Sequence, residues 1–157
     1  MTKALHRKYS IGRDRLWLST YFRQELLAQP FPAVSLQWID AGMGWGVFAE
    51  KDFAPMEFIA EYTGVVRRRT KEDSKNSYCF EYLILPDEPT DYLIDAADRG
   101  NIARYINHKS SPNLSSAMIA YMDVSHIILY TSKPIKKGEE LSYDYGEAFW
   151  SKRGPPR

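Results

Sequence analysis

The stretches RYINHKSSPN, at residues 104–113, and GEELSYDYG, at residues 138–146, carry the most specific pattern in this sequence of 157 residues. Each stretch is ambiguous when taken alone. Asn107 and His108 are more often a capped helix end than a functional site, and SSPN is a common turn. Tyr143 and Tyr145, two residues apart on a strand, would face the same side, where packing alone explains them. The meaning of these stretches therefore depends on the rest of the chain.

Two further strings stand upstream, AGMGWGVFA at residues 41–49 and EYTGVV at residues 61–66. Gly42, Gly44 and Gly46 give G-x-G-x-G without the third glycine of the dinucleotide-binding fingerprint, and neither a P-loop lysine nor a G-x-S-x-G elbow is present. Glycines this close together indicate positive φ angles or a close approach of another group to the backbone. A plain tight turn explains the glycines equally well on their own.

Composition excludes several classes of protein. There are eleven tyrosines, seven phenylalanines and four tryptophans, the formal net charge is +1, and Cys79 is the single cysteine. One cysteine and three dispersed histidines predict neither a disulfide nor a structural zinc cluster, and no metal is expected. A charge near neutrality disfavours a nucleic-acid binder, and no apolar run reaches the roughly 20 residues of a membrane span. Cys79 is predicted to be a core thiol, and the chain a soluble protein of a reducing compartment.

Hydrophobic periodicity predicts a mainly β protein with short helices. A long helix is expected over residues 14–29, beginning at Asp14 and stopped by Pro30, and a short one over 98–106. Residues 34–49 read as strand, turn, strand, and the basic run at 67–69 as a solvated loop. Further strands are expected at 57–62, 78–85, 92–95, 119–123 and 127–132. The predicted organisation is a helical extension over 1–33, a domain over 34–150 and a flexible tail over 151–157.

The four motifs, in their order and spacing, resemble the SET-domain family of protein lysine methyltransferases. The resemblance runs from about Ser35 to Trp150 and includes the IDA of residues 94–96 and the GN of residues 100–101. It implies a β-clip-like fold of several small sheets, in which the C-terminal segment is threaded as a pseudoknot through the loop around Asn107 and His108. The methyl donor, S-adenosylmethionine, and the substrate lysine would enter from opposite faces and meet in a narrow channel.

The resemblance also implies roles for individual residues. Tyr145 matches the catalytic tyrosine, Tyr62 a tyrosine that shapes the lysine channel, and Tyr143 a position where a hydroxyl limits the product, so that mono- or dimethylation is expected. The residues implied to bind or support the cofactor are Gly44, Trp45, Gly46, Arg104, Asn107, His108, Tyr145 and Trp150.

The sequence departs from the family pattern after the asparagine-histidine pair. Many members have serine and cysteine there and a later cysteine-rich segment, which together bind zinc, whereas this chain has Lys109 and Ser110 and no later cysteine. The channel must therefore be completed without a zinc-bound lid. Short members of the family often pair, so a homodimer is among the expected partners, together with a lysine-bearing protein or peptide such as a histone tail. No nucleic acid or membrane partner is expected.

Two other functions fit parts of the sequence. One is a SET-like scaffold that binds a peptide or the donor with little turnover; the other is an unrelated β-clip binder with grooves lined by tyrosine, which leaves the ordered motifs unexplained. The expected location is intracellular, in the nucleus or cytoplasm, with a secreted bacterial effector that acts in a host cell as the alternative.

Overall fold

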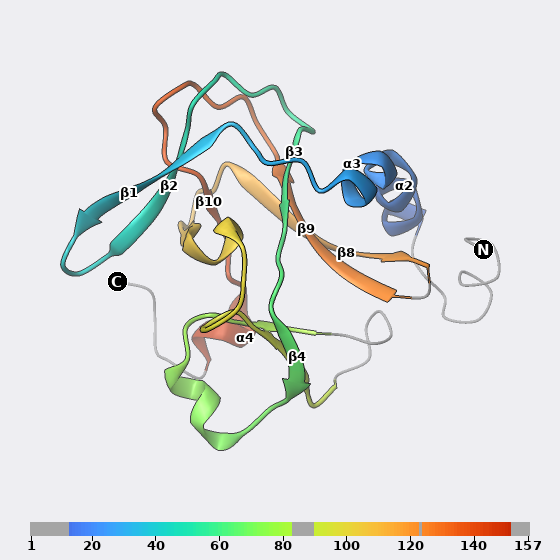
Figure 1. Ribbon diagram of the computed structural model, residues 1–157, viewed down its shortest axis with the longest axis vertical. Coiled ribbons are helices and arrows are strands. Elements are labelled where there is room, and N and C mark those ends of the chain that lie inside the picture. The colour runs from blue at the N-terminus through green and yellow to red at the C-terminus, as the bar shows by residue number, and fades with distance from the viewer. Residues whose placement is uncertain (1–12, 83–89, 123, 152–157) are drawn as a thin grey trace.

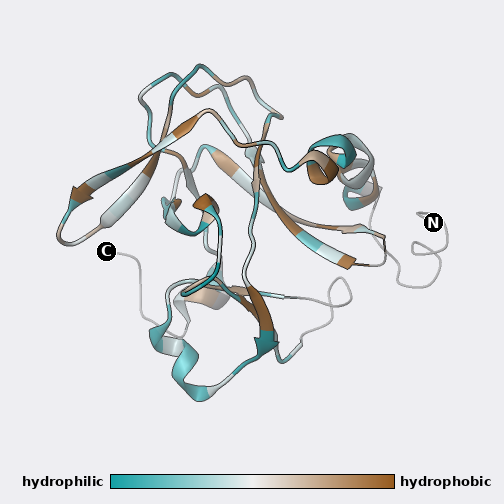
Figure 2. Ribbon diagram, viewed as in Figure 1, coloured by the Kyte–Doolittle hydropathy of each residue, from teal (hydrophilic) through white to brown (hydrophobic). Residues whose placement is uncertain are grey.

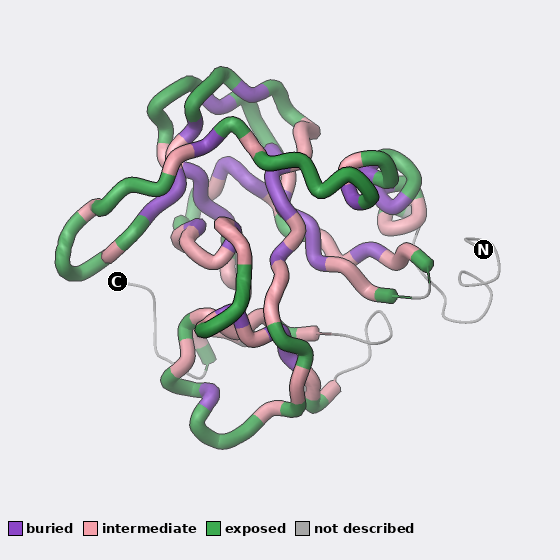
Figure 3. Tube along the Cα trace, in the orientation of Figure 1, coloured by how far each residue is buried: buried purple, intermediate pink, exposed green. Residues whose placement is uncertain are grey.

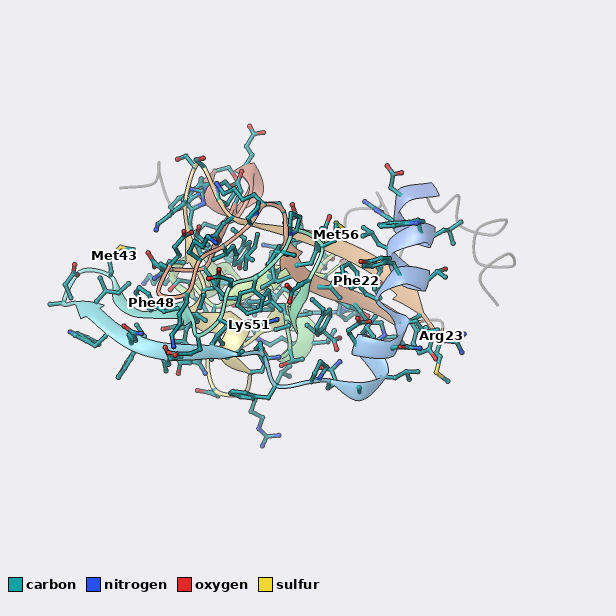
Figure 4. All side chains as sticks on the ribbon, turned by 90° about the horizontal axis from the view of Figure 1, so that it is seen from above. Phe22, Arg23, Met43, Phe48, Lys51 and Met56 are labelled. Carbon is teal, nitrogen blue, oxygen red and sulfur yellow. The ribbon has the colours of Figure 1, made fainter. Side chains whose placement is uncertain are left out.

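The computed structural model describes residues 13–82, 90–122 and 124–151, and its small sheets are arranged around a shared apolar centre (Figure 1). Strands β1 (Val34–Asp40) and β2 (Gly44–Ala49) form a hairpin that projects from the body. The Asp40 carboxylate accepts hydrogen bonds from the backbone N–H groups of Gly42 and Met43, at 2.7 and 2.8 Å, and closes its tip. Met43 lies at the far end of this hairpin (Figure 4). The predicted strand, turn, strand unit is therefore confirmed.

The body contains two three-stranded sheets and one short parallel pair. One sheet has the order β3-β9-β8 and the other β4-β6-β5, both antiparallel. The parallel pair joins β7 to β10. The bounds are β3 (Phe58–Glu61), β4 (Val65–Arg68), β5 (Cys79–Glu81), β6 (Tyr92–Asp95), β7 (Asn107–His108), β8 (Leu114–Tyr121), β9 (Val124–Thr131) and β10 (Ser142–Tyr143).

The main core lies where these sheets meet. Ile59, Leu129, Ile135 and Leu141 are fully buried there, with Tyr62 and Tyr143 at its margin. Figure 2 shows apolar residues on the strands that converge on this centre, and Figure 3 shows the buried segments gathered there while the hairpin tip is exposed. The mainly β class with several small sheets is thus as predicted. No helix among the described residues is long and apolar enough to cross a bilayer.

The N-terminal helices form a second, smaller core with the β3-β9-β8 sheet. The predicted single helix over residues 14–29 is in fact two helices, α2 (Arg13–Tyr21) and α3 (Arg23–Ala28), because Phe22 leaves the helical conformation at φ −94° and ψ 16°. The hydroxyls of Ser19 and Thr20 bond back to carbonyls four residues earlier, which bends helices. Phe22 is fully buried and points from the helices toward the sheet (Figure 4). The predicted boundary at residues 33 and 34 stays a prediction.

A second helix prediction was also wrong in length. Residues 98–106 contain only the single 3-10 turn η2 (Ile102–Tyr105). Asn101 caps this turn by accepting a hydrogen bond from the Ala103 N–H at 3.1 Å, while its side-chain NH₂ donates to the Glu61 carbonyl at 2.6 Å. Because both ends of the Asn101 side chain are engaged, the turn starts after Asn101, which shortens the segment to one turn.

The basic run at 67–69 is not a solvated loop. Arg67 lies on β4 and pairs with Asp73, at 2.5 Å, and with Asp95, at 2.7 Å. Asp73 is buried in the 3-10 turn η1 (Lys71–Lys75), and the Arg67 guanidinium lowers the pKa of its carboxyl from 3.8 to about 2. These ion pairs join η1 to the β4-β6-β5 sheet.

In the predicted strand 78–85, only Cys79–Glu81 is a strand, and residues 83–85 lie outside the described residues.

Candidate functional site

The candidate site is built around the parallel pairing of β7 and β10, which brings together the two stretches that dominate the sequence. Ser142 is in register with Asn107, and Tyr143 with His108. Asn113 stabilises the junction, because its side-chain NH₂ donates to the Glu140 carbonyl at 2.9 Å and its side-chain oxygen accepts from the Ser142 N–H at 2.9 Å. Segments 104–113 and 138–146 therefore meet in space, as the family resemblance implies.

One side of this junction is an aromatic pocket. The rings of Tyr143 and Tyr145 lie 4.8 Å apart, Tyr143 stacks on Phe80 at 6.2 Å, and Phe80 lies 5.2 Å from Tyr62. The adjoining cavity of about 300 Å³ is lined by Tyr143, Tyr145 and twelve other residues. Its size suits one extended side chain. The predicted channel tyrosines are therefore neighbours in space, although they come from distant parts of the chain.

Tyr62 does not itself line the cavity but lies against Phe80, which does. The three tyrosine hydroxyls differ in their partners. Tyr62 donates to the Tyr78 carbonyl at 2.8 Å, and Tyr145 donates to the Ile106 carbonyl at 2.9 Å. Tyr143 is only 5% exposed, and its hydroxyl has no hydrogen-bond partner among the described residues. Burial raises the pKa of all three phenols well above 10. The hydroxyls therefore stay protonated throughout the physiological range and act as neutral dipoles, not as bases.

The other side of the junction is polar. The Asn107 side-chain NH₂ donates to the Trp45 carbonyl at 3.2 Å and to Glu140 Oε1 at 3.0 Å. Gly46 faces the same groups, and a Cβ there would lie 2.6 Å from Ile39 Cδ1 and 3.3 Å from Asn107 Nδ2. Gly44 has a φ of +76°, which other residues rarely adopt. Both glycines are thus required by the geometry, Gly44 for its turn and Gly46 for its close packing.

An aromatic cluster joins the two sides near the C-terminal helix α4 (Glu147–Trp150). His108 lies edge-on to Trp150 at 4.8 Å, and Trp150 is parallel to Tyr145 at 6.1 Å. The His108 Nε2 and Trp150 Nε1 atoms are both buried without a hydrogen-bond partner among the described residues. Buried polar atoms are normally hydrogen-bonded, so these two nitrogens could donate to a polar molecule or to water.

Arg104 lies on the channel side of the junction. Its guanidinium carbon is 4.5 Å from the Tyr78 ring centroid and 5.0 Å from that of Tyr105. Tyr78 is also the residue whose carbonyl holds the Tyr62 hydroxyl. This position agrees with the supporting role expected for Arg104, which stays a prediction.

Sequence reasoning missed several residues of the site. Phe80 lines the cavity with Cys79, which is only partly buried and so is not the core thiol that was expected. Phe149 also lines it, and the sequence had already offered the Phe149–Trp150 end as one way to complete the channel, beside a partner subunit or the substrate itself. Phe80 carried no signal in the sequence, because only the pairing of β5 with β6 brings it to the tyrosines. Glu140 lies within the GEEL string, yet nothing in the sequence marked its contact with Asn107. The described residues contain no cluster of three or more histidine, cysteine or acidic side chains that could hold a metal ion.

Comparison with known proteins identifies the family. The model of the SET domain matches residues 44–146, a range that contains every predicted site residue except Trp150. The chain is 37% identical over 116 residues to the histone-lysine N-methyltransferase Su(var)3-9 of Drosophila melanogaster, which covers 66% of this chain and 18% of that protein. It is 38% identical over 108 residues to the histone-lysine N-methyltransferase set-2 of Caenorhabditis elegans, a match that covers 65% of this chain and 7% of that protein. It is 36% identical over 118 residues to human EHMT1, a match that covers 71% of this chain and 9% of that protein. The chain thus spans less than a fifth of each of these relatives. With two thirds of its own length matched by the family model, this protein belongs to the SET-domain family.

Proposed function

We propose that this domain transfers a methyl group from S-adenosylmethionine to the side-chain amine of a protein lysine. The observation that carries the proposal is the junction of β7 and β10, which has a pocket of protonated tyrosines on one side and the Asn107 region on the other. The relatives described above are named as histone-lysine methyltransferases, which supports the same reaction.

The polar side of the junction fits the cofactor. Gly44 is partly exposed and Trp45 is exposed beside the buried Gly46. Asn107 offers a side-chain oxygen, and His108 and Trp150 offer buried nitrogens that lack a hydrogen-bond partner among the described residues. We assign donor binding to Gly44, Trp45, Gly46, Asn107, His108 and Trp150, with Arg104 in support and Tyr145 at the boundary with the lysine channel. When bound, the cofactor supplies an electrophilic methyl group on a positively charged sulfur.

The aromatic side fits a lysine side chain. A free lysine amine has a pKa of about 10.4, so its deprotonation at pH 7 costs about 4.6 kcal/mol. Burial in the pocket, and the positive charge of the donor, both disfavour the ammonium form and lower that cost. Because the pKa values of Tyr62, Tyr143 and Tyr145 are raised, none of these residues serves as the base, and the proton leaves to solvent before transfer.

The chain's own contribution is alignment of the amine. The Tyr145 hydroxyl is held by the Ile106 carbonyl at 2.9 Å, so its oxygen has a defined position beside the reacting groups. Its lone pairs can accept weak C–H contacts from the polarised methyl group, and fixed orientation supplies much of the rate in such transfers. Tyr145 is the proposed catalytic residue, and Tyr62, held by the Tyr78 carbonyl, shapes the channel.

Tyr143 is proposed to limit the product to mono- or dimethyl-lysine. Its buried hydroxyl has no partner among the described residues and so is free to hold the amine or a water beside it. Each added methyl group removes a hydrogen-bond donor from the amine and needs the space that this hydroxyl occupies.

The proposed substrate is a basic protein segment such as a histone tail. Glu81, Asp144 and Glu147 line the cavity together with Arg69, which pairs with Glu81 at 3.1 Å, and the Asp144 side chain is 62% exposed. Acidic groups beside a lysine channel that are not neutralised by a neighbour favour positively charged chains over neutral ones. The homodimer and the intracellular or effector location stay predictions.

The test is incubation of the purified chain with labelled S-adenosylmethionine and a panel of histones, histone peptides and other basic proteins, followed by mass spectrometry. Mono- or dimethyl-lysine at a mapped position is the expected product. Donor binding in calorimetry without transfer to any member of the panel would favour the scaffold alternative. Absence of donor binding would contradict the proposal.

A further inference from the structure

We propose that Glu140, paired with Lys109, is a positioning residue that sets the orientation of the Asn107 amide and thereby the strength of donor binding. The inference rests on the proposed function, because it takes Asn107 to bind the methyl donor. Glu140 itself need not touch the donor. Its effect on the site passes through Asn107.

The contacts form a continuous chain of polar groups. Lys109 Nζ lies 2.7 Å from Glu140 Oε2, and Glu140 Oε1 accepts a hydrogen bond from Asn107 Nδ2 at 3.0 Å. The same Asn107 nitrogen donates to the Trp45 carbonyl at 3.2 Å. One carboxylate therefore connects a lysine cation to the amide at the centre of the polar side.

This arrangement admits one orientation of the amide. The Trp45 carbonyl is an acceptor only, and a carboxylate with its other oxygen on a lysine cation is also an acceptor only. The two hydrogens of the Asn107 NH₂ group are consumed by these partners. The side-chain oxygen of Asn107 must then point away from both and is presented as an acceptor, as an ammonium group on a ligand requires. If the amide were flipped, the side-chain oxygen of Asn107 would face the Trp45 carbonyl oxygen and Glu140 Oε1, and neither pair could form a hydrogen bond.

Glu140 is itself held in place. Its carbonyl accepts from Asn113 Nδ2 at 2.9 Å, and its backbone forms a β-bridge with Phe48, next to the glycine strand. The Glu140 side chain is only 15% exposed, whereas the Lys109 side chain is 47% exposed. A Cβ at Gly46 would lie 3.1 Å from Glu140 Oε1, so the carboxylate reaches Asn107 along a path that the glycine leaves open. The carboxylate is thus the fixed member, and Lys109 neutralises its charge from the surface.

The proposal makes graded predictions for donor affinity, measured by calorimetry with S-adenosylmethionine. Glu140→Ala should raise Kd by about tenfold or more, because a charge-assisted hydrogen bond is lost. Glu140→Gln should raise it about fivefold, because a glutamine amide can also donate to Asn107 and so permits the flipped state. Lys109→Met should have a smaller effect, about threefold, since its ion pair is half exposed. Lys109→Arg keeps the positive charge and should bind the donor as tightly as the wild-type chain. Glu139→Gln alters a neighbouring carboxylate outside the site and is the matched control, with an unchanged Kd expected.

Further readouts separate positioning from general structural damage. In the donor-free chain, the ¹⁵N-labelled side-chain amide signals of Asn107 should shift in Glu140→Gln and stay unchanged in Glu139→Gln. At saturating donor, kcat should stay within about twofold of normal while the donor KM rises, and the KM for the lysine substrate and the Tm should be little changed.

The outcomes distinguish this proposal from the proposed function. A wild-type chain that binds donor and transfers methyl groups, together with Glu140 and Lys109 variants of unchanged donor Kd, overturns the role of Glu140 and leaves the proposed function standing. If Glu140→Ala fails to fold, the surface variant Lys109→Met still decides the matter by its donor Kd. A wild-type chain that binds no donor overturns both.

Discussion

The two sides of the β7–β10 junction are built by opposite means. On the polar side, which the proposal assigns to the donor, Asn107 is fixed by a carbonyl and a carboxylate. The lack of a side chain at Gly46 leaves room for Ile39, Glu140 and Asn107 to pack closely. On the aromatic side, Tyr62 and Tyr143 are buried and Tyr145 is partly buried, and their positions depend on ring contacts and on two backbone carbonyls. In the proposed function, the polar side binds the donor through directed contacts, whereas the aromatic side excludes water and aligns the lysine amine. Damage to one side should therefore change affinity, and damage to the other should change rate.

The largest expected effect is on the lysine side. Tyr145→Phe removes the hydroxyl held by Ile106 while keeping the ring contacts, so turnover should fall by about 10²-fold or more with donor binding preserved. Methyl transfer to a histone panel, followed by mass spectrometry, measures the loss. Tyr130→Phe, on the second core away from the junction, is the matched control. Near-normal transfer by Tyr145→Phe would remove Tyr145 from the catalytic role.

The ion pair of Arg67 with Asp73, a residue that lines the cavity, gives the next largest effect. Asp73→Asn should lower the free energy of unfolding by about 2 kcal/mol at pH 7, because it breaks a buried charge-assisted contact with Arg67. The pKa of Asp73 is about 2 in the folded chain against an ordinary 3.8, so its stabilisation is present above pH 4 and is lost as the pH falls toward 2.

Urea unfolding at several pH values tests this. The difference in the free energy of unfolding between the wild-type chain and Asp73→Asn should shrink steadily from pH 5 to pH 2. The exposed Asp98→Asn should unfold with the same free energy as the wild-type chain. If the difference for Asp73→Asn stays constant with pH, the carboxylate charge is not what stabilises η1.

On the donor side, Gly46→Ala should weaken donor binding by about tenfold, since overpacking costs roughly 1–3 kcal/mol and the added Cβ displaces Ile39 or Asn107. Calorimetry with S-adenosylmethionine measures it. Gly42→Ala, whose Cβ would meet only Asp40 at 3.3 Å, is the control within the same hairpin. Equal affinities for both variants would show that the close packing at Gly46 does not serve the donor.

Tyr143→Phe is expected to change the identity of the product more than the rate. Loss of its hydroxyl should leave overall transfer within about tenfold while the product moves toward trimethyl-lysine, because space opens beside the amine. Mass spectrometry of the product after long incubation reads the methylation state directly. A normal chain that already yields mainly trimethyl-lysine would contradict the role given to Tyr143.

Local patterns allowed much of the fold and the site to be predicted. The hairpin of residues 34–49 follows from alternation and glycines. Tyr143 and Tyr145 are neighbours at 4.8 Å, but not through a shared strand face as expected, because β10 ends at Tyr143. The break at Phe22 could not be read from helical periodicity, because burial of Phe22 against the sheet is a tertiary effect. The strand at residues 92–95 was placed correctly, since its apolar run has clear turns on both sides.

The parts that escaped prediction depend on pairings across long stretches of chain. Arg67 was taken for a solvated residue because its acidic partner Asp95 lies 28 residues away and is brought near by the β4–β6 register. Glu140 and Asn107, 33 residues apart, meet for the same kind of reason. Motif order could place both residues in one site, but only the folded arrangement gives their contact.

The most direct test of the two-sided site measures donor Kd and the single-turnover rate at saturating donor for Tyr145→Phe and Gly46→Ala in parallel. Tyr145→Phe should keep its Kd within about twofold and lose most of its rate, while Gly46→Ala should lose affinity and keep its rate. A reversed result, or loss of both quantities in both variants, would contradict the separation of donor binding from alignment across the β7–β10 junction.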